Sequence, residues 1–176
     1  MGGAFDPNVY YRFFNNYDVN KTMSIKKGVG EQESTLMMIP AGSNSKENWQ
    51  IYYQGGRYFF RNYEYGGSMQ LGLNKDSKNP ALIARDGSLE QQWTLATTPD
   101  KKWYTVTNEL LGNESYLALT GDYTWPVMQH STKGALWTIE INRSAGTVNA
   151  YMTEGFPNLE VSEYIDDGLV CVRPTK

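Results

Sequence analysis

Three tryptophans recur at a fixed interval of 44 residues, at Trp49, Trp93 and Trp137. Each begins a short run in which apolar residues alternate with others, and this alternation is the period of a β-strand. A fixed period indicates that the chain is built from similar units, which constrains its architecture more than any single motif does.

A second motif, Tyr-x-(Phe/Val)-x-Asn, also occurs three times, starting at Tyr11, Tyr58 and Tyr104. Its alternation predicts a strand, and its asparagine is well suited to satisfy backbone groups in the turn that follows. Two further apolar runs separate each asparagine from the next tryptophan. In the second and third units the later run follows Pro80 or Pro126, and proline at the first residue of a strand breaks no ladder hydrogen bond.

Each unit therefore contains four short strands, in repeats of about 8–54, 55–100 and 101–142. Strands this short cannot bury a face alone, so the three units must share one core. We expect an all-β fold: a closed or capped barrel with pseudo-threefold symmetry, which also leaves no exposed sheet edge. A four-bladed propeller would need a fourth copy, whereas a two-sheet sandwich without internal symmetry remains an alternative.

Residues 143–176 follow the last repeat. They contain two runs with strand character, 148–152 and 169–172, and are too apolar for a solvated linker. We expect this C-terminal extension to pack on the barrel or to pair with another chain, which would make a homodimer.

The charge and apolar patterns argue against two classes of partner, nucleic acids and membranes. The net charge is −3 and no basic stripe is present, which argues against nucleic-acid binding. No stretch approaches the roughly 20 apolar residues of a membrane span. The single cysteine, Cys171, allows no disulfide within the chain, and residues 1–8 lack the features of a signal peptide. A cytoplasmic protein is the simplest expectation, or a secreted one if a signal peptide has been removed.

The tyrosine start, the later aspartate and the Gln-x-Trp finish, in three tandem copies, resemble the ricin B-type β-trefoil lectins. The compact, cysteine-poor fungal members are the most similar, over about residues 8–142. The finish is complete only at Gln91-Gln92-Trp93; the other copies have Glu47 and Ala135 in place of the glutamine. The resemblance implies a β-trefoil that binds carbohydrate without catalysis. The three tryptophans are expected to be core residues, and the glutamine to satisfy buried backbone groups.

In this family the resemblance implies shallow sugar pockets around the second and third strands of each repeat. Asp76 and Asp122 stand at matching positions in the second and third copies, and Gly28 stands there in the first. The third copy is the richest in candidate ligand-binding residues: Asp122, Tyr123, Trp125, Gln129 and His130.

Trp125 lies outside the threefold tryptophan set, so core symmetry does not explain it. A pyranose binds through a ring that stacks on its apolar face and a polar side chain that holds its hydroxyls. Trp125 and Asp122 could supply these. The alternatives are that Trp125 caps the barrel or anchors the extension, that Asp122 only forms a turn, and that His130 is a surface residue.

Many family members carry an aspartate inside the second strand, where this chain has Ser24, Gly72 and Ala118. The set of sugar sites is therefore expected to be eroded, and two other functions stay open. A β-trefoil with lost sugar sites could bind proteins, for example as a protease inhibitor. It could also be a small enzyme that uses Asp122, Tyr123 and His130. One histidine and one cysteine cannot build a usual zinc site, and no cofactor is expected.

Overall fold

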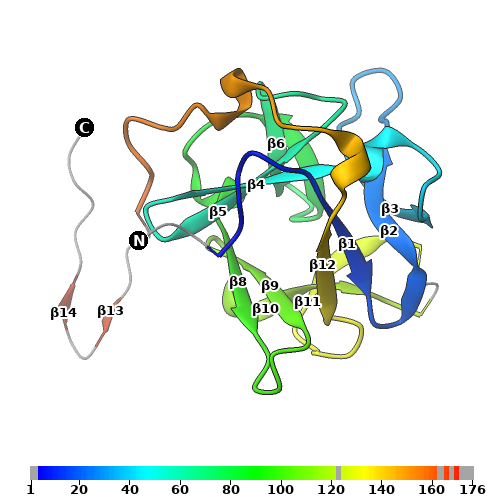
Figure 1. Cartoon of the computed structure of the whole chain (residues 1–176). Helices are drawn as coiled ribbons and strands as arrows, with labels where there is room; N and C mark the ends of the chain where they lie inside the picture. Colours follow the sequence, from blue (N-terminus) through cyan, green and yellow to red (C-terminus); the bar gives the residue numbers. More distant parts are fainter. Residues whose placement is uncertain (1–3, 122–123, 162–164, 167–168, 171–176) are drawn as a thin grey trace.

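The computed structural model describes residues 4–121 and 124–161, together with the backbone of 165–166 and 169–170. Twelve antiparallel strands form one continuous sheet, and the helical segments in the described part are short 3-10 turns. Figure 1 shows this all-β body with the chain after β12 running over one side. The predicted all-β, twelve-stranded, three-repeat fold is confirmed.

Six strands close into a barrel, because each pairs with its neighbour around a complete ring in the order β1-β4-β5-β8-β9-β12. The barrel strands are β1 (Tyr11–Asn15), β4 (Trp49–Gln54), β5 (Arg57–Asn62), β8 (Trp93–Thr97), β9 (Tyr104–Asn108) and β12 (Trp137–Ile141). Closure leaves no free edge in this ring.

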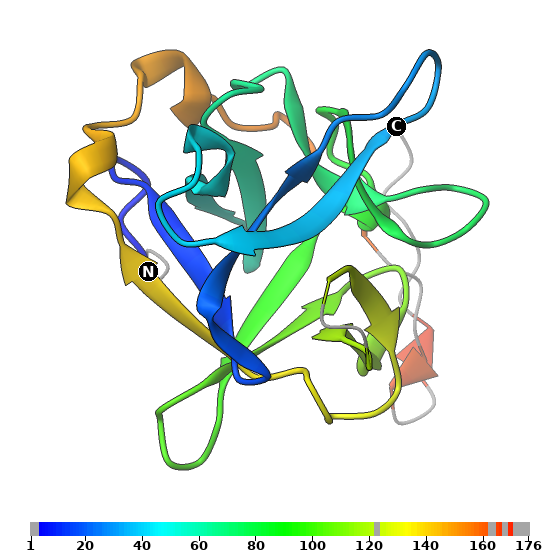
Figure 2. The same ribbon diagram turned by 90° about the vertical axis from the view of Figure 1, so that its right-hand side faces the viewer.

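The remaining six strands form three hairpins, one in each repeat (Figure 2, where the first is the blue pair in front). They are β2 (Asp18–Lys26) with β3 (Ser34–Pro40), β6 (Met69–Leu73) with β7 (Pro80–Ala84), and β10 (Gly112–Leu119) with β11 (Pro126–Gln129). The 3-10 turns η1 (Ser45–Glu47) and η2 (Leu89–Gln91) lead into the barrel strands that begin at Trp49 and Trp93.

The three repeated tryptophans are fully buried at 0% exposure. Each indole N–H donates to a backbone carbonyl of the hairpin in its own repeat, at 2.9, 2.9 and 2.8 Å. The acceptors are Met23, Leu71 and Leu117. A buried indole thus fills the core and has its one donor satisfied, three times over. Their assignment to the core is confirmed.

The repeated tyrosines and asparagines join neighbouring barrel strands. Tyr11, Tyr58 and Tyr104 stand opposite the three tryptophans in the strand register. Each asparagine amide donates to a carbonyl three residues before a tryptophan, and its oxygen accepts from a backbone N–H two residues later. The asparagines are Asn15, Asn62 and Asn108. The predicted turn role of the asparagine is confirmed.

The residue two positions before each repeated tryptophan differs between the repeats, and its surroundings differ with it. Gln91 donates to the Ala84 carbonyl at 2.7 Å and accepts from the Asp86 N–H at 3.0 Å, as expected for a residue that satisfies backbone groups. Glu47 accepts instead from Thr22 at 2.8 Å and from the N–H of Gly42. In the third repeat this position is the buried Ala135, whose side chain has no polar atom to satisfy backbone groups.

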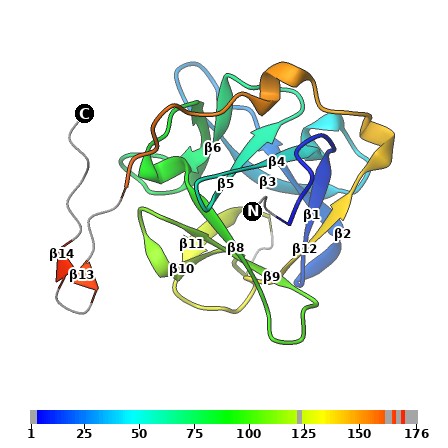
Figure 3. The same cartoon turned by 60° about the vertical axis from the view of Figure 1, so that its left-hand side comes forward.

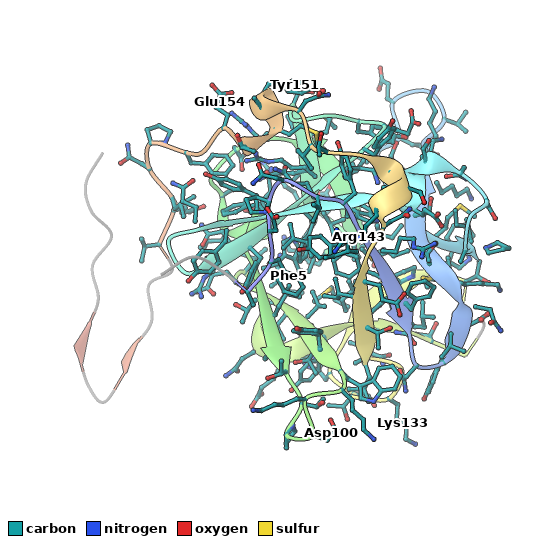
Figure 4. The ribbon with its side chains drawn as sticks, in the orientation of Figure 1. Phe5, Asp100, Lys133, Arg143, Tyr151 and Glu154 are labelled. Atoms are coloured by element: carbon teal, nitrogen blue, oxygen red, sulfur yellow. The ribbon has the colours of Figure 1, made fainter. Side chains whose placement is uncertain are left out.

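A phenylalanine that precedes the first repeat closes one end of the barrel. The ring of Phe5 packs against the rings of Tyr11, Tyr58 and Tyr104, with centroids 5.3, 5.9 and 5.5 Å away. Figure 4 labels Phe5 on the N-terminal segment beside the barrel strands. One residue therefore contacts all three repeats at the pseudo-threefold axis.

Residues 143–160, which we call the strap, pack on the first and second repeats (Figure 3, orange). Met152 of the strap is 0% exposed, and its sulfur accepts from the Tyr10 hydroxyl at 3.4 Å. Phe156 packs on Phe59 with ring centroids 4.9 Å apart, and its backbone pairs with the Gln54 amide. The strap begins with η3 (Arg143–Ala145) and also contains η4 (Ala150–Thr153).

The strap also completes the surroundings of a buried charge. Arg61 in β5 is 0% exposed and donates to Gln70 at 3.2 Å and to the strap carbonyls of Met152 and Glu154. Burial, with a smaller contribution from the positive charge of Arg85, lowers the pKa of Arg61 to about 10. Arg61 thus stays protonated at neutral pH, held by carbonyl oxygens and the faces of Tyr52 and Phe156.

Candidate carbohydrate-binding site

The second and third hairpins have matching loops. Leu73 stands opposite Pro80 in one hairpin, and Leu119 stands opposite Pro126 in the other. Each loop, 74–79 or 120–125, therefore has the same length, and Asn79 of one corresponds to Trp125 of the other. Asp122 and Tyr123, two of the predicted ligand-binding residues, lie outside the described residues.

Trp125 is partly buried and lies against the first repeat. The Lys26 ammonium stands over its ring, 4.5 Å from the centroid, and comes from the end of β2. Next to it, the Thr124 carbonyl accepts from the Met38 N–H of β3 at 2.8 Å. The ring is thus fixed between the first and third repeats, and it is not part of the buried tryptophan set. We call the contact of Lys26 with Trp125 the lysine–tryptophan junction.

Gln129 and His130 lie at the other end of β11. His130 is five residue steps along the extended chain from Trp125, which corresponds to roughly 16 Å. The Gln129 amide donates to the carbonyls of Ser131 and Lys133, and the exposed His130 ring nitrogen Nδ1 lies 3.0 Å from the Glu114 carbonyl. Their polar atoms therefore hold local chain segments, and one pocket of monosaccharide size would not reach both ends of this strand.

Asp76 belongs to the second hairpin. Its N–H and that of Ser77 donate to the Asn74 side chain, each at 2.9 Å, so Asn74 fixes the loop. Asp76 itself is exposed. The structure therefore places Trp125, Gln129 and His130 on one hairpin and Asp76 on another.

A cavity of about 440 Å³ lies between the first and second hairpins. Its lining residues are polar except for one alanine: Glu31, Gln32, Glu33, Thr35, Asn74, Ser77, Asn79 and Ala81. Glu33 accepts from the Asn74 amide at 2.6 Å across this cavity. We call it the acidic cavity, because its lining has two carboxylates and neither an aromatic ring nor a cation. It offers hydrogen-bond partners but no stacking surface for a sugar.

Sequence reasoning missed Lys26. It lies in the first repeat, whose loop has Gly28 at the position of Asp76 and Asp122, so no motif pointed to it. Only the packing of the β2–β3 hairpin against the third repeat brings it to Trp125. The signal that could have suggested it is the basic pair Lys26-Lys27 in an otherwise acidic chain.

No group of three or more His, Cys, Asp or Glu side chains in the described part of the chain is arranged to hold a metal ion. Within the same residues, no helix is both long enough and apolar enough to cross a membrane.

Comparison with solved structures identifies the fold. A mosquitocidal holotoxin matches with a TM-score of 0.67 and 19% identity. The match covers 94% of this chain and 20% of the toxin chain. The designed threefold-symmetric protein ThreeFoil matches with a TM-score of 0.62 and 14% identity, over 76% of this chain and 98% of its own. A Polyporus squamosus lectin matches with a TM-score of 0.61 and 15% identity, over 78% of this chain and half of its own.

No protein-family model matches the chain, and no curated protein matches its sequence. The chain spans only about a fifth of the toxin, so the match concerns one part of that larger protein. The twelve strands, the closed ring and these matches agree, and the chain is structurally similar to the ricin B-type β-trefoil lectins.

Proposed function

We propose that this chain is a non-catalytic carbohydrate-binding module whose main site is the loop 120–125. The observation that carries the proposal is the placement of Trp125: a tryptophan outside the buried set, partly exposed, and fixed at the junction of two repeats. The fold interior accounts for the three repeated tryptophans, Trp49, Trp93 and Trp137, but not for this one.

The chemistry of the loop fits a pyranose. An indole face packs against the apolar face of a sugar ring, and a carboxylate or amide accepts hydrogen bonds from adjacent hydroxyls. In this proposal Trp125 stacks, Asp122 accepts from the hydroxyls, and Tyr123 contributes a second ring. Gln129 and His130 shape the far end of the hairpin. Asp76 belongs to a second, weaker sugar-binding position in the second repeat.

Two further points support the proposal. The Polyporus squamosus lectin, which has the same fold, is described as bound to the epitope Neu5Aca2-6Galb1-4GlcNAc. Within this chain, the acidic cavity lacks the ring that stacking requires, which leaves the third-repeat loop as the better candidate. Pairing of two chains through residues 143–176 stays a prediction, which sedimentation equilibrium would check.

A glycan array with the full chain tests the function. We expect binding to a limited set of glycans, followed by dissociation constants in the micromolar to millimolar range, because shallow sites bury little ligand surface. Soluble saccharide should compete with the immobilised glycan. A folded wild-type chain that binds no glycan on a broad array would overturn the proposal.

A further inference from the structure

The two sides of the first hairpin carry opposite charge. Lys26, at the end of β2, faces the third repeat at the lysine–tryptophan junction. Glu31 and Glu33, further along the same hairpin connection, line the acidic cavity against the second repeat. The β2–β3 hairpin thus presents a cation to one neighbour and carboxylates to the other, although the chain as a whole is acidic.

The position of Lys26 affects what can stack on Trp125. The Lys26 side chain is exposed, and a cation–π contact at an exposed ammonium is weak, so an incoming ligand can move the ammonium aside. It remains tethered at the edge of the ring, because Thr124 is hydrogen-bonded to Met38 and Lys26 pairs with Thr35 in the hairpin. A ligand on the ring therefore meets a positive charge at its rim.

Neutral and anionic sugars would interact differently with Lys26 beside the Trp125 ring. A neutral sugar that stacks on Trp125 displaces the cation–π contact and offers the ammonium only hydroxyls. A sugar with a carboxylate or sulfate can stack and also pair its anion with Lys26, in a charge-assisted hydrogen bond. An anionic sugar would therefore gain a contact with Lys26 that a neutral sugar lacks.

We propose that Lys26 of the first repeat and Trp125 of the third repeat together form a site that prefers anionic glycans. This inference rests on the proposed carbohydrate-binding function and adds a ligand class and a residue from a different repeat. The acidic cavity, with two glutamates in its lining, would repel the same anions.

The test uses the full chain on an array of neutral glycans, each matched with its sialylated and its sulfated counterpart. We expect the wild type to bind the acidic members about threefold to fivefold tighter, which is the range of a solvent-exposed ion pair. The preference should decline as salt is raised. Lys26→Gln should abolish it while the neutral glycans still bind, and Trp125→Ala should weaken both members of each pair.

Lys27→Gln is the matched control, because it removes the same charge from the adjacent exposed lysine. Lys27→Gln should keep the preference for acidic glycans. Lys26→Gln and Lys27→Gln should both unfold at the wild-type temperature. Equal binding of neutral and acidic glycans by the wild type would overturn the role of Lys26 and leave the proposed function standing. An equal loss in both lysine variants would reduce the effect to net charge and also overturn it. Absence of binding to every glycan would overturn both proposals.

Discussion

The barrel interior and the hairpin loops differ in how closely the three repeats agree. In the interior, each repeat makes the same indole-to-carbonyl bond, at 2.8 to 2.9 Å, and the same asparagine contact. In the loops, one junction has a lysine over a tryptophan and another has an acidic cavity. The repeated residues thus determine the fold, and the unrepeated residues at the junctions are where a specific function can arise.

The largest effect should come from breaking the repeated interior. Trp93→Ala should lower the free energy of unfolding by about 3–5 kcal/mol, because a fully buried tryptophan leaves a cavity and removes a satisfied indole donor. Trp125→Ala, at a partly buried residue outside the core, should lower it by no more than about 1 kcal/mol. Chemical denaturation of both variants measures this contrast, and equal losses would contradict the division into core and loop tryptophans.

The strap is not repeated in the chain, yet it has a structural role. Its variants therefore test whether unrepeated residues also stabilise the fold. Met152→Ala should cost about 2–5 kcal/mol, since the side chain is fully buried against the barrel. Its neighbour Tyr151 is 59% exposed, and Tyr151→Ala should change stability by about 0.5 kcal/mol or less. Denaturation curves of the pair provide the check. If the two variants were equally stable, the strap would not be part of the folded core.

Phe5 is a second unrepeated residue that serves the fold. Phe5→Ala should cost about 2 kcal/mol, less than for a fully buried phenylalanine, because the ring is only partly covered. The loss follows from its contacts with three tyrosines at one end of the barrel. A melting temperature unchanged from the wild type would show that the Phe5 ring does not stabilise this end of the barrel.

The smallest effect is expected at His130. The strand β11 separates this residue from Trp125, so His130→Ala should change glycan affinity by less than about twofold. Isothermal titration with the best array glycan measures the change. A loss as large as that of Trp125→Ala would mean that the ligand extends along the whole hairpin.

The periodic part of this fold could be predicted from the sequence, because recurring side chains imply recurring contacts. The tryptophans, tyrosines and asparagines marked the strands and turns of all three repeats. Contacts made once had no such signal. Phe5 on three tyrosines, Met152 beneath the strap and Lys26 over Trp125 each join segments distant in sequence. For the candidate site, the sequence indicated the third-repeat loop but could not show that its neighbour across the repeat boundary is a lysine.

The most direct test of the central claim compares two residues at the same position of equivalent loops. Trp125→Ala and Asn79→Ala would be titrated with the glycan that the wild type binds best, after both have been shown to be folded. We expect Trp125→Ala to lose at least about tenfold in affinity, or ~1.4 kcal/mol, and Asn79→Ala to keep the wild-type value. Unchanged binding by Trp125→Ala, or an equal loss in both variants, would contradict the assignment of the site to the third repeat.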